Sequence, residues 1–221
     1  MTDTSTTKLL IPAAGFGKRL GGKGAKELLC LKDEDLPILE HTLQLAKAYN
    51  FKSVVITREN KTDLNTYLDL KKREYDFEVC KIVSSIEWPD TLLQSEKYWG
   101  SKNIVILPDT RFMPLTILKQ LSEGLNTFSI VFATFFQKDL STWGSVRQES
   151  DQFYIAEKPS SFKEDDLAWG LFGFRKDIGL SLLQTILESK NQFSMLPSKH
   201  IQFYPLEYFE DKTRDGMQAF K

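Results

Sequence analysis

Apolar residues recur along the chain with two periods, and these predict strands that alternate with helices. Short apolar or β-branched runs predict strands at Lys8–Ala13, Ser53–Thr57, Phe77–Ser84, Asn103–Leu107, Ser129–Phe135, Ala168–Arg175 and His200–Leu206. Apolar residues three or four apart predict helices at Ile38–Tyr49, Asp63–Arg73, Asp90–Trp99, Leu115–Leu125 and Lys176–Ser189. The expected helix N-caps are Asn60 or Thr62 for the second helix and Asp90 for the third.

Strands and helices that alternate at this spacing predict an α/β fold. We expect a mostly parallel, mixed sheet covered by helices on both faces. The second half differs, because Ser145–Glu149 and Phe153–Glu157 predict a hairpin around Ser150-Asp151. The stretches Ser160–Asp166 and Ser189–Pro197 are predicted as loops.

The first predicted strand enters a glycine-rich loop that carries basic residues. Gly15 and Gly17 are followed by Lys18 and Arg19, and Lys26 lies seven residues further on. Glycine lets the backbone approach an anion closely, and the cations can neutralise it, so the segment suits a phosphate group. The alternative is an ordinary glycine turn with solvated basic residues. The dinucleotide-binding fingerprint is incomplete, because no third glycine follows at the required spacing.

Asp109 follows the apolar run Ile104–Leu107 and Pro108. Ligands of parallel sheets bind at the carboxyl ends of the strands, where the glycine loop is also expected. A carboxylate there can hold a divalent cation over bound phosphates. A turn aspartate or a helix cap is the alternative.

Two further constellations follow. Lys158, in Glu157-Lys158-Pro159, comes at a strand end, where it can place a charge on a phosphate, although a surface-loop lysine is the alternative. Gly144 and Gly170 stand beside tryptophans, where a ligand can approach a strand closely. For Phe172 and Phe174, core packing beside a bulge is the preferred interpretation.

Composition narrows the classes of partner. The chain has 221 residues, with 29 Lys and Arg against 30 Asp and Glu, a formal net charge of -1. This balance argues against nucleic acid and an anionic membrane as partners, so phosphate affinity must be local. Residues 1–7 form a polar tail without a signal-peptide core, and we expect a cytoplasmic protein. A homo-oligomer is compatible with the sequence.

Cysteine and histidine are too sparse for a soft-metal site. Cys30 and Cys80 are expected to pack as small apolar groups, and His41 and His200 lie far apart in sequence. A metal ion should therefore be bound by carboxylate oxygens, which favours Mg²⁺.

The order of these motifs resembles that of the sugar-1-phosphate nucleotidylyltransferases, closest to the UTP–glucose-1-phosphate uridylyltransferase and glucose-1-phosphate thymidylyltransferase branches. The resemblance runs from about Leu9 to Phe174. It rests on Ile11-Pro12-Ala13-Ala14-Gly15-Phe16-Gly17-Lys18-Arg19-Leu20, Ala25-Lys26-Glu27-Leu28-Leu29, Leu107-Pro108-Asp109, Trp143-Gly144, Glu157-Lys158-Pro159 and Trp169-Gly170.

The resemblance implies a Rossmann-like, GT-A-like nucleotidyltransferase fold in one domain over residues 8–221. Residues 8–135 would bind the nucleotide, and residues 136–221 would bind the sugar phosphate. It also implies a Mg²⁺-dependent attack of a sugar 1-phosphate on the α-phosphorus of a nucleoside triphosphate, with UTP or dTTP favoured.

The resemblance also assigns roles to residues. The nucleotide would be bound by Ala13, Ala14, Gly15, Gly17 and Lys18. The catalytic residues would be Arg19, Lys26 and Asp109. The sugar phosphate would be bound by Gly144, Glu157, Lys158 and Gly170. Asp109 would bind Mg²⁺ together with Asp211 or Glu210.

The chain departs from the family at several of these positions. Ala25 stands where the family has proline, and Pro108 where it has glycine. Trp88-Pro89-Asp90-Thr91 replaces a glycine-rich stretch near the base, so the sequence leaves the base open. Two alternatives remain: a cytidylyltransferase that acts on an alcohol phosphate, such as phosphocholine or an erythritol phosphate, and a non-catalytic protein that binds nucleotide sugars.

Overall fold

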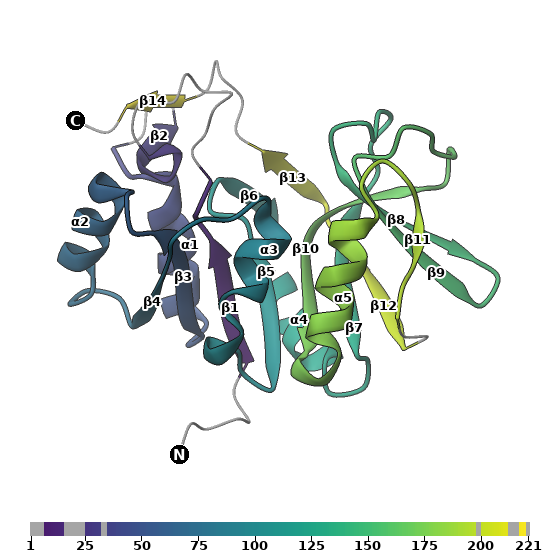
Figure 1. Cartoon of the computed structure of the whole chain (residues 1–221), viewed down its shortest axis with the longest axis horizontal. Helices are drawn as coiled ribbons and strands as arrows, with labels where there is room; N and C mark the ends of the chain where they lie inside the picture. Colours follow the sequence, from purple (N-terminus) through teal and green to yellow (C-terminus); the bar gives the residue numbers. More distant parts are fainter. Residues whose placement is uncertain (1–6, 16–24, 32–34, 198–199, 212–216, 220–221) are drawn as a thin grey trace. The chain divides into compact units, whose positions relative to one another are not determined.

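The computed structural model describes residues 7–15, 25–31, 35–197, 200–211 and 217–219, and it gives only the backbone of residues 31, 208–211 and 217–219 (Figure 1). The chain divides into two compact units, each built from several segments. The N-terminal unit comprises Lys8–Tyr98, Val105–Arg111 and Glu210–Lys221. The C-terminal unit comprises Met1–Thr7, Trp99–Ile104 and Phe112–Phe209.

The N-terminal unit is built on parallel strands. Its principal strands are β1 (Thr7–Pro12), β3 (Lys52–Arg58), β4 (Phe77–Ile82) and the end of β5 (Lys102–Ile106), with the short strands β2 (Leu29–Leu31) and β14 (Met217–Ala219) pairing separately. Its helices are α1 (Ile38–Ala48), α2 (Thr62–Lys71), α3 (Trp88–Leu93) and the 3₁₀ turns η2 (Lys26–Leu28) and η3 (Glu96–Tyr98).

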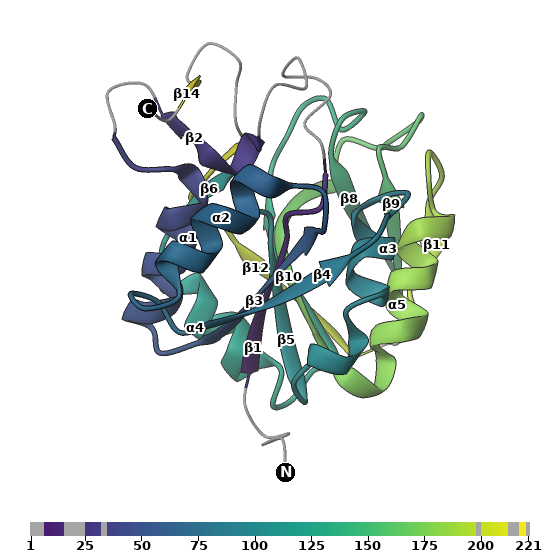
Figure 2. The ribbon, with the colours of Figure 1, turned by 60° about the vertical axis from the view of Figure 1, so that its left-hand side comes forward.

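The strand order β5-β1-β3-β4 places helices on both faces of this unit's sheet. β1 pairs with β3, and β3 with β4, in parallel register, so the chain advances in one direction through α1 and α2. It then returns through α3 to β5. Right-handed crossovers that run in opposite directions put their helices on opposite faces. Figure 2 shows α1 and α2 on one side of β3 and β4 and α3 on the other.

Burial explains why these segments fold as they do. One apolar cluster joins α1 and α2 to one face of the sheet, and it consists of Ile11, Ala13, Leu39, Leu43, Val55, Leu64, Leu68, Tyr75 and Phe77. On the other face, the buried Cys80 of β4 lies near Lys97 of η3. The strands are therefore apolar on both faces, as expected for a covered parallel sheet.

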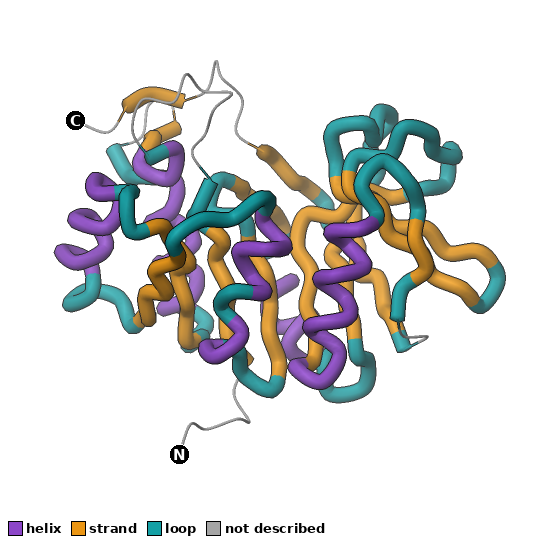
Figure 3. Tube along the Cα trace, in the orientation of Figure 1, coloured by secondary structure: helices purple, strands orange, loops and turns teal. Residues whose placement is uncertain are grey.

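The C-terminal unit is mostly antiparallel. Its strands are β7 (Ile130–Phe135), β8 (Gly144–Glu149), β9 (Gln152–Glu157), β10 (Leu167–Arg175), β11 (Ser194–Met195) and β12 (Ile201–Pro205), and its helices are α4 (Ile117–Gly124) and α5 (Lys176–Glu188) (Figure 3). Four of the described strands are divided between the units: β1, β5, β6 (Thr110–Met113) and β13 (Tyr208–Asp211).

In this unit β11, β9, β8 and β10 are successive neighbours, and β7 lies between β10 and β12. Only the β7–β12 pair among these is parallel. α4 and α5 cover opposite faces: Gly124 of α4 approaches Val131, whereas Gly179 of α5 approaches Phe174. Val131 is paired with Gly173, the residue adjacent to Phe174, so their side chains point to opposite faces.

The predicted α/β fold, with a mostly parallel, mixed sheet covered by helices on both faces, is confirmed, as is the β8–β9 hairpin. Two predicted helix caps are wrong. The N-cap of α2 is Lys61, without a side-chain cap bond, and the N-cap of α3 is Glu87. Asp90 lies inside α3, where its carboxylate accepts a hydrogen bond from the Ile86 N–H. Pro89 starts that helix earlier than expected.

Both cysteines are buried, as predicted, and burial raises the pKa of the Cys80 thiol. Over the ranges given above, no helix is long and apolar enough to cross a bilayer.

Candidate active site

The end of β1 brings Ala13, Ala14 and Gly15 to the carboxyl edge of the parallel strands. The Ala13 N–H donates to the carbonyl of Ile56, 2.8 Å away, which prolongs the pairing of β1 with β3 beyond Pro12. Ala13 and Ala14 are buried and Gly15 is exposed. Among the described residues, a Cβ placed on Gly15 would meet only Cε of Lys26, at 3.9 Å. With respect to these residues the backbone at Gly15 is therefore open, and the Lys26 side chain runs beside it.

Lys26 and Asp109 form an ion pair at the same edge. Lys26 begins η2, and its Nζ lies 2.9 Å from Oδ2 of Asp109. Asp109 follows β5 in a turn that is closed by a hydrogen bond from Thr110 Oγ1 to the Leu107 carbonyl. The Asp109 side chain is 3% exposed and that of Lys26 is 19% exposed. The structure thus brings together the predicted lysine, the predicted aspartate and Gly15.

A third charged residue, Lys61, lies beneath this edge. Its buried Nζ donates to the carbonyls of Ala13 and Gly15 and to the carboxylate of Glu27. Burial lowers the pKa of Lys61, and this outweighs the opposing effect of Glu27; the positive charges of Lys26 and Arg58 lower it further. The positive charges of Lys26, Arg58 and Lys61 at one strand edge make a site that suits an anion.

Some predicted residues cannot be placed. Gly17, Lys18 and Arg19 lie outside the described residues, as do the side chains of Glu210 and Asp211, whose backbones end β13. Among the side chains that the structure describes, no three of His, Cys, Asp and Glu form a group able to hold a metal ion. Asp109 contributes a hard carboxylate oxygen, the donor type that Mg²⁺ prefers.

In the C-terminal unit, the predicted sugar-phosphate residues Gly144 and Glu157 are brought together. Gly144 opens β8 and is paired with Glu157 at the end of β9. The indole of Trp169 lies against Gly144. The pairing of β10 with β7 shifts its register between Trp169 and Leu171, so Gly170 is the extra residue of a bulge.

Lys158 follows the last residue of β9, as predicted, in an unusual conformation. Its φ is 54°, in the left-handed region that disfavours residues with a Cβ. Its N–H donates to the Trp143 carbonyl at 3.0 Å, and its Nζ lies 3.3 Å from Oε1 of Glu157. The Lys158 side chain is 43% exposed, whereas that of Glu157 is 8% exposed. A buried carboxylate therefore orients an accessible ammonium.

Comparison with known proteins identifies the fold. No protein-family profile matches the sequence, and no curated protein matches it. Among solved structures, a putative glucose-1-phosphate thymidylyltransferase from Bacillus anthracis, in complex with sucrose, superposes with a TM-score of 0.74 at 16% identity over 93% of this chain and 89% of that one. A UDP-glucose pyrophosphorylase complexed with UDP-glucose gives a TM-score of 0.64 at 20% identity over 86% of this chain and 91% of that one.

The chain has the fold of the sugar-1-phosphate nucleotidyltransferases. The fold expected from the resemblance of the motifs is thus confirmed. The identities are too low for the superpositions to decide an activity, which must be argued from the residues.

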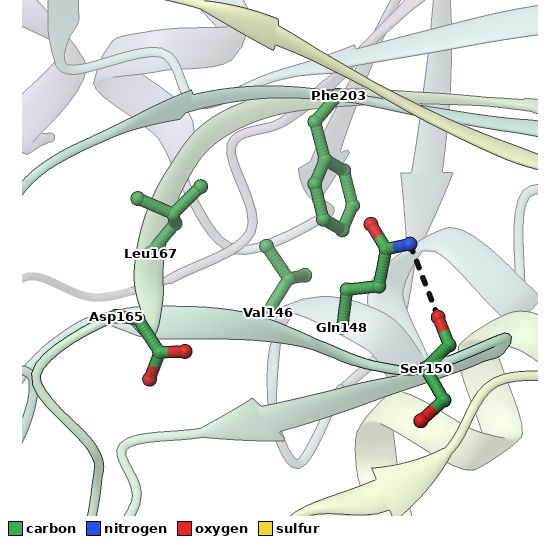
Figure 4. A pocket seen from close by; sticks show the side chains of 6 residues that line it. All are labelled: Val146, Gln148, Ser150, Asp165, Leu167 and Phe203. Atoms are coloured by element: carbon green, nitrogen blue, oxygen red, sulfur yellow. Dashed lines mark hydrogen bonds between the residues drawn. The ribbon is translucent and has the colours of Figure 1, made fainter.

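A pocket of about 370 Å³ lies at the other end of the β8–β9 hairpin (Figure 4). It is lined by Val146, Gln148, Ser150, Asp165, Leu167 and Phe203. Gln148 bonds to the Ser150 carbonyl, beside the hairpin turn, whereas Gly144 and Glu157 form the opposite end. The described residues that line the pocket include no cation, so it does not suit a phosphate.

Reasoning from the sequence missed Lys61 and Glu27. Lys61 lies in the polar stretch Glu59–Asp63, which suggests a solvated turn. Glu27 gives one weak signal, a carboxylate that is followed by the apolar pair Leu28-Leu29.

Proposed function

We propose that this protein is a nucleotidyltransferase that joins a nucleoside triphosphate, with UTP or dTTP favoured, to a sugar 1-phosphate. The observation that carries this proposal is the Lys26–Asp109 ion pair beside the open backbone of Gly15. A lysine next to a carboxylate on a parallel-strand edge supplies both signs of charge that a triphosphate and its counter-cation require.

The reaction is an in-line displacement. An oxygen of the sugar 1-phosphate bonds to the α-phosphorus, the bond from that phosphorus to the bridging oxygen breaks, and pyrophosphate leaves with the electron pair. Lys26 would neutralise the charge that grows on the α-phosphate, while the backbone at Ala13–Gly15 would bind the nucleoside. Gly17, Lys18 and Arg19 would bind the outer phosphates. Positioning and charge neutralisation are sufficient for such a reaction.

Lys158 would hold the phosphate of the sugar. Its ammonium is accessible and is oriented by the buried Glu157. Glu157 and the backbone at Gly144 and Gly170 would contact the sugar. The left-handed conformation of Lys158 supports this role, because strained residues concentrate at functional sites.

Asp109 would hold Mg²⁺, together with Asp211 or Glu210. The ion would supply positive charge that reduces the repulsion between the two anionic substrates. A single carboxylate is compatible with this role, because Mg²⁺ is commonly bound by one or two carboxylates plus phosphate oxygens and water.

The choice of base and acceptor draws support from the two similar structures, a glucose-1-phosphate thymidylyltransferase and a UDP-glucose pyrophosphorylase. The Glu157-Lys158-Pro159 turn supports a sugar phosphate over an alcohol phosphate, because it resembles the motif of that family.

A substrate panel tests the proposal. The purified protein is incubated with Mg²⁺, each of UTP, dTTP, CTP, ATP and GTP, and either a hexose 1-phosphate or phosphocholine, and pyrophosphate release is measured. We expect release with UTP or dTTP only when a sugar 1-phosphate is present. Pyrophosphate release with CTP and phosphocholine instead would show that the acceptor is an alcohol phosphate and not a sugar 1-phosphate. Tight binding of a nucleotide sugar in calorimetry without turnover in any combination would refute the enzymatic function.

A further inference from the structure

The Lys61 ammonium is fully hydrogen-bonded in a buried position. Its three donors match three acceptors: the Ala13 carbonyl at 2.8 Å, the Gly15 carbonyl at 3.0 Å and Glu27 Oε2 at 2.6 Å. The side chains of Lys61 and Glu27 are 4% and 0% exposed. Neither residue is among those to which the proposed function assigns a role.

The three acceptors belong to two chain segments that the proposed reaction needs at a fixed spacing. Ala13 and Gly15 follow the end of β1, where the triphosphate would bind, whereas Glu27 is the neighbour of Lys26 in η2. Along the chain, residues 16–24 separate the two segments. The Lys61 ammonium contacts both, and Lys26 in turn contacts Asp109.

Stability alone is a weak reason for such an arrangement. Two charges taken out of water pay a large desolvation cost, and apolar residues of similar volume often replace a buried ion pair without loss of stability. A buried ammonium whose three donors are all bonded, as in Lys61, does, however, specify one geometry, because each bond has a narrow range of distance and angle. Here that geometry includes two backbone carbonyls of the phosphate-binding segment.

We propose that Lys61 and Glu27 form a positioning pair that fixes Gly15 and Lys26 at the spacing at which they bind the triphosphate. This inference rests on the proposed function. Lys61 acts through Lys26 and the backbone, and it does not itself touch the substrate. The pair therefore affects the rate of the chemical step more than the stability of the fold.

The test uses the full chain with three variants: the apolar double variant Lys61→Met/Glu27→Met, the single variant Glu27→Met, and the conservative Glu27→Gln, which retains an acceptor for Lys61. The matched control is Lys72→Met, because Lys72 follows the same helix but pairs with Asp69 in an exposed position. For each protein we measure Tm, kcat and KM for the triphosphate, and amide hydrogen exchange resolved by segment.

We expect the double variant to keep a Tm close to that of the wild type while kcat falls about 100-fold, since a misplacement of about 1 Å costs that much. Amide exchange should accelerate in residues 8–31 and stay unchanged in the C-terminal unit. If the double variant does not fold, the single variant Glu27→Met tests the proposal. Its amide hydrogen exchange should accelerate over residues 25–31, and its kcat should be reduced. Glu27→Gln and Lys72→Met should retain wild-type rates.

Failure of this inference is distinguishable from failure of the proposed function. A wild-type protein that releases no pyrophosphate refutes the function, and the exchange measurement then still decides on the pair. The pair is refuted if the variants that fold match the wild type in both kcat and exchange over residues 8–31. It is also refuted if activity and Tm fall together in proportion, since that marks a purely structural role.

Discussion

The indole of Trp169 occupies the space that a side chain on residue 144 would need, because a Cβ placed on Gly144 would fall 2.5 Å from Nε1 of the ring. Gly144 belongs to β8 and Trp169 to β10, so the glycine allows a large ring to lie across two neighbouring strands. The same contact borders the residue pair Gly144–Glu157, to which we assign the sugar phosphate.

Replacing Gly144 should therefore destabilise the protein. We expect Gly144→Ala to lower the free energy of unfolding by about 1–3 kcal/mol, because the added methyl group forces the indole to move. Urea denaturation measures this. Gly15→Ala is the matched control, because among the residues that the structure describes its Cβ would meet only Cε of Lys26, at an ordinary distance. Equal stability of Gly144→Ala and the wild type would contradict the packing described.

The Lys26–Asp109 pair should be essential for turnover. We expect Lys26→Met and Asp109→Asn each to lower kcat by about 10²–10³-fold, the range typical of lost transition-state charge stabilisation. Steady-state pyrophosphate release measures the effect, and circular dichroism checks that Lys26→Met is folded. Lys8→Met is the control, because Lys8 pairs with Glu78 at the amino end of β1. Full activity of Lys26→Met would refute our assignment of the site.

Lys158 offers a test that separates strain from charge. Lys158→Gly removes both the ammonium and the Cβ that makes the left-handed conformation unfavourable, whereas Lys158→Ala removes only the ammonium. We expect both variants to show a raised KM for the sugar 1-phosphate and an unchanged KM for the triphosphate. Lys158→Gly should unfold with a free energy about 1–2 kcal/mol higher than that of Lys158→Ala. If the two variants are equally stable, the backbone at residue 158 is not strained.

Glu40 has an environment that makes stability depend on pH. Its buried carboxylate accepts hydrogen bonds from Lys71 at 2.8 Å, from Tyr75 at 2.9 Å and from Tyr67. Burial alone would raise the pKa of Glu40, but the bonds from Lys71, Tyr67 and Tyr75 outweigh it and hold the pKa below 4.5. Burial and the bond to Glu40 raise the pKa of Tyr75 to about 12.

These shifts predict losses of stability at both ends of the pH range. The Glu40 contribution is present above about pH 4.5 and is lost as the pH falls through the lowered pKa, because the unfolded state then binds the proton more readily. The contribution of Tyr75 to the free energy of unfolding is present below pH 10 and is lost as the pH rises through about 12. Glu40→Gln should cost roughly 2 kcal/mol at pH 7 and should flatten the acid limb of stability against pH.

Urea unfolding at pH 4 and pH 7 measures the acid effect. Glu74→Gln is the control, because Glu74 also pairs with Lys71 but is half exposed, and we expect little change from it. A Glu40→Gln variant as pH-sensitive as the wild type would assign the acid effect to other groups.

Local sequence was sufficient for most of the regular structure. The apolar and β-branched runs predicted β1, β3, β4, β5, β7, β10 and β12, and the run is continuous in buried strands such as β1, because a strand covered on both faces must be apolar throughout. The short strands β2, β6, β11, β13 and β14 were not predicted, because two to four residues carry no readable period. The cap prediction for α3 was wrong because Pro89, in the first turn, lets the helix begin at Trp88, before Asp90. The cap prediction for α2 was wrong because that helix begins after Lys61, which makes no side-chain cap bond.

Part of the site followed from topology, since the carboxyl ends of parallel strands meet at one edge. Gly15 and Asp109 were predicted to lie there, and the structure adds that Lys26 bonds directly to Asp109. The Glu157-Lys158 turn was placed at a strand end, but its left-handed backbone was not predictable. The roles of Arg19 and of Glu210 or Asp211 stay predictions.

The sequence by itself determined the α/β fold, the glycine–lysine loop and the edge on which Asp109 lies, because apolar periodicity and chain order express these directly. Only the tertiary structure decided which charges are buried together. Glu27 and Lys61 are polar residues 34 positions apart. Their burial depends on the packing of η2 and α2 around the end of β1, since a buried ammonium such as that of Lys61 is tolerated only where the tertiary structure supplies an opposite charge and acceptors for its donors.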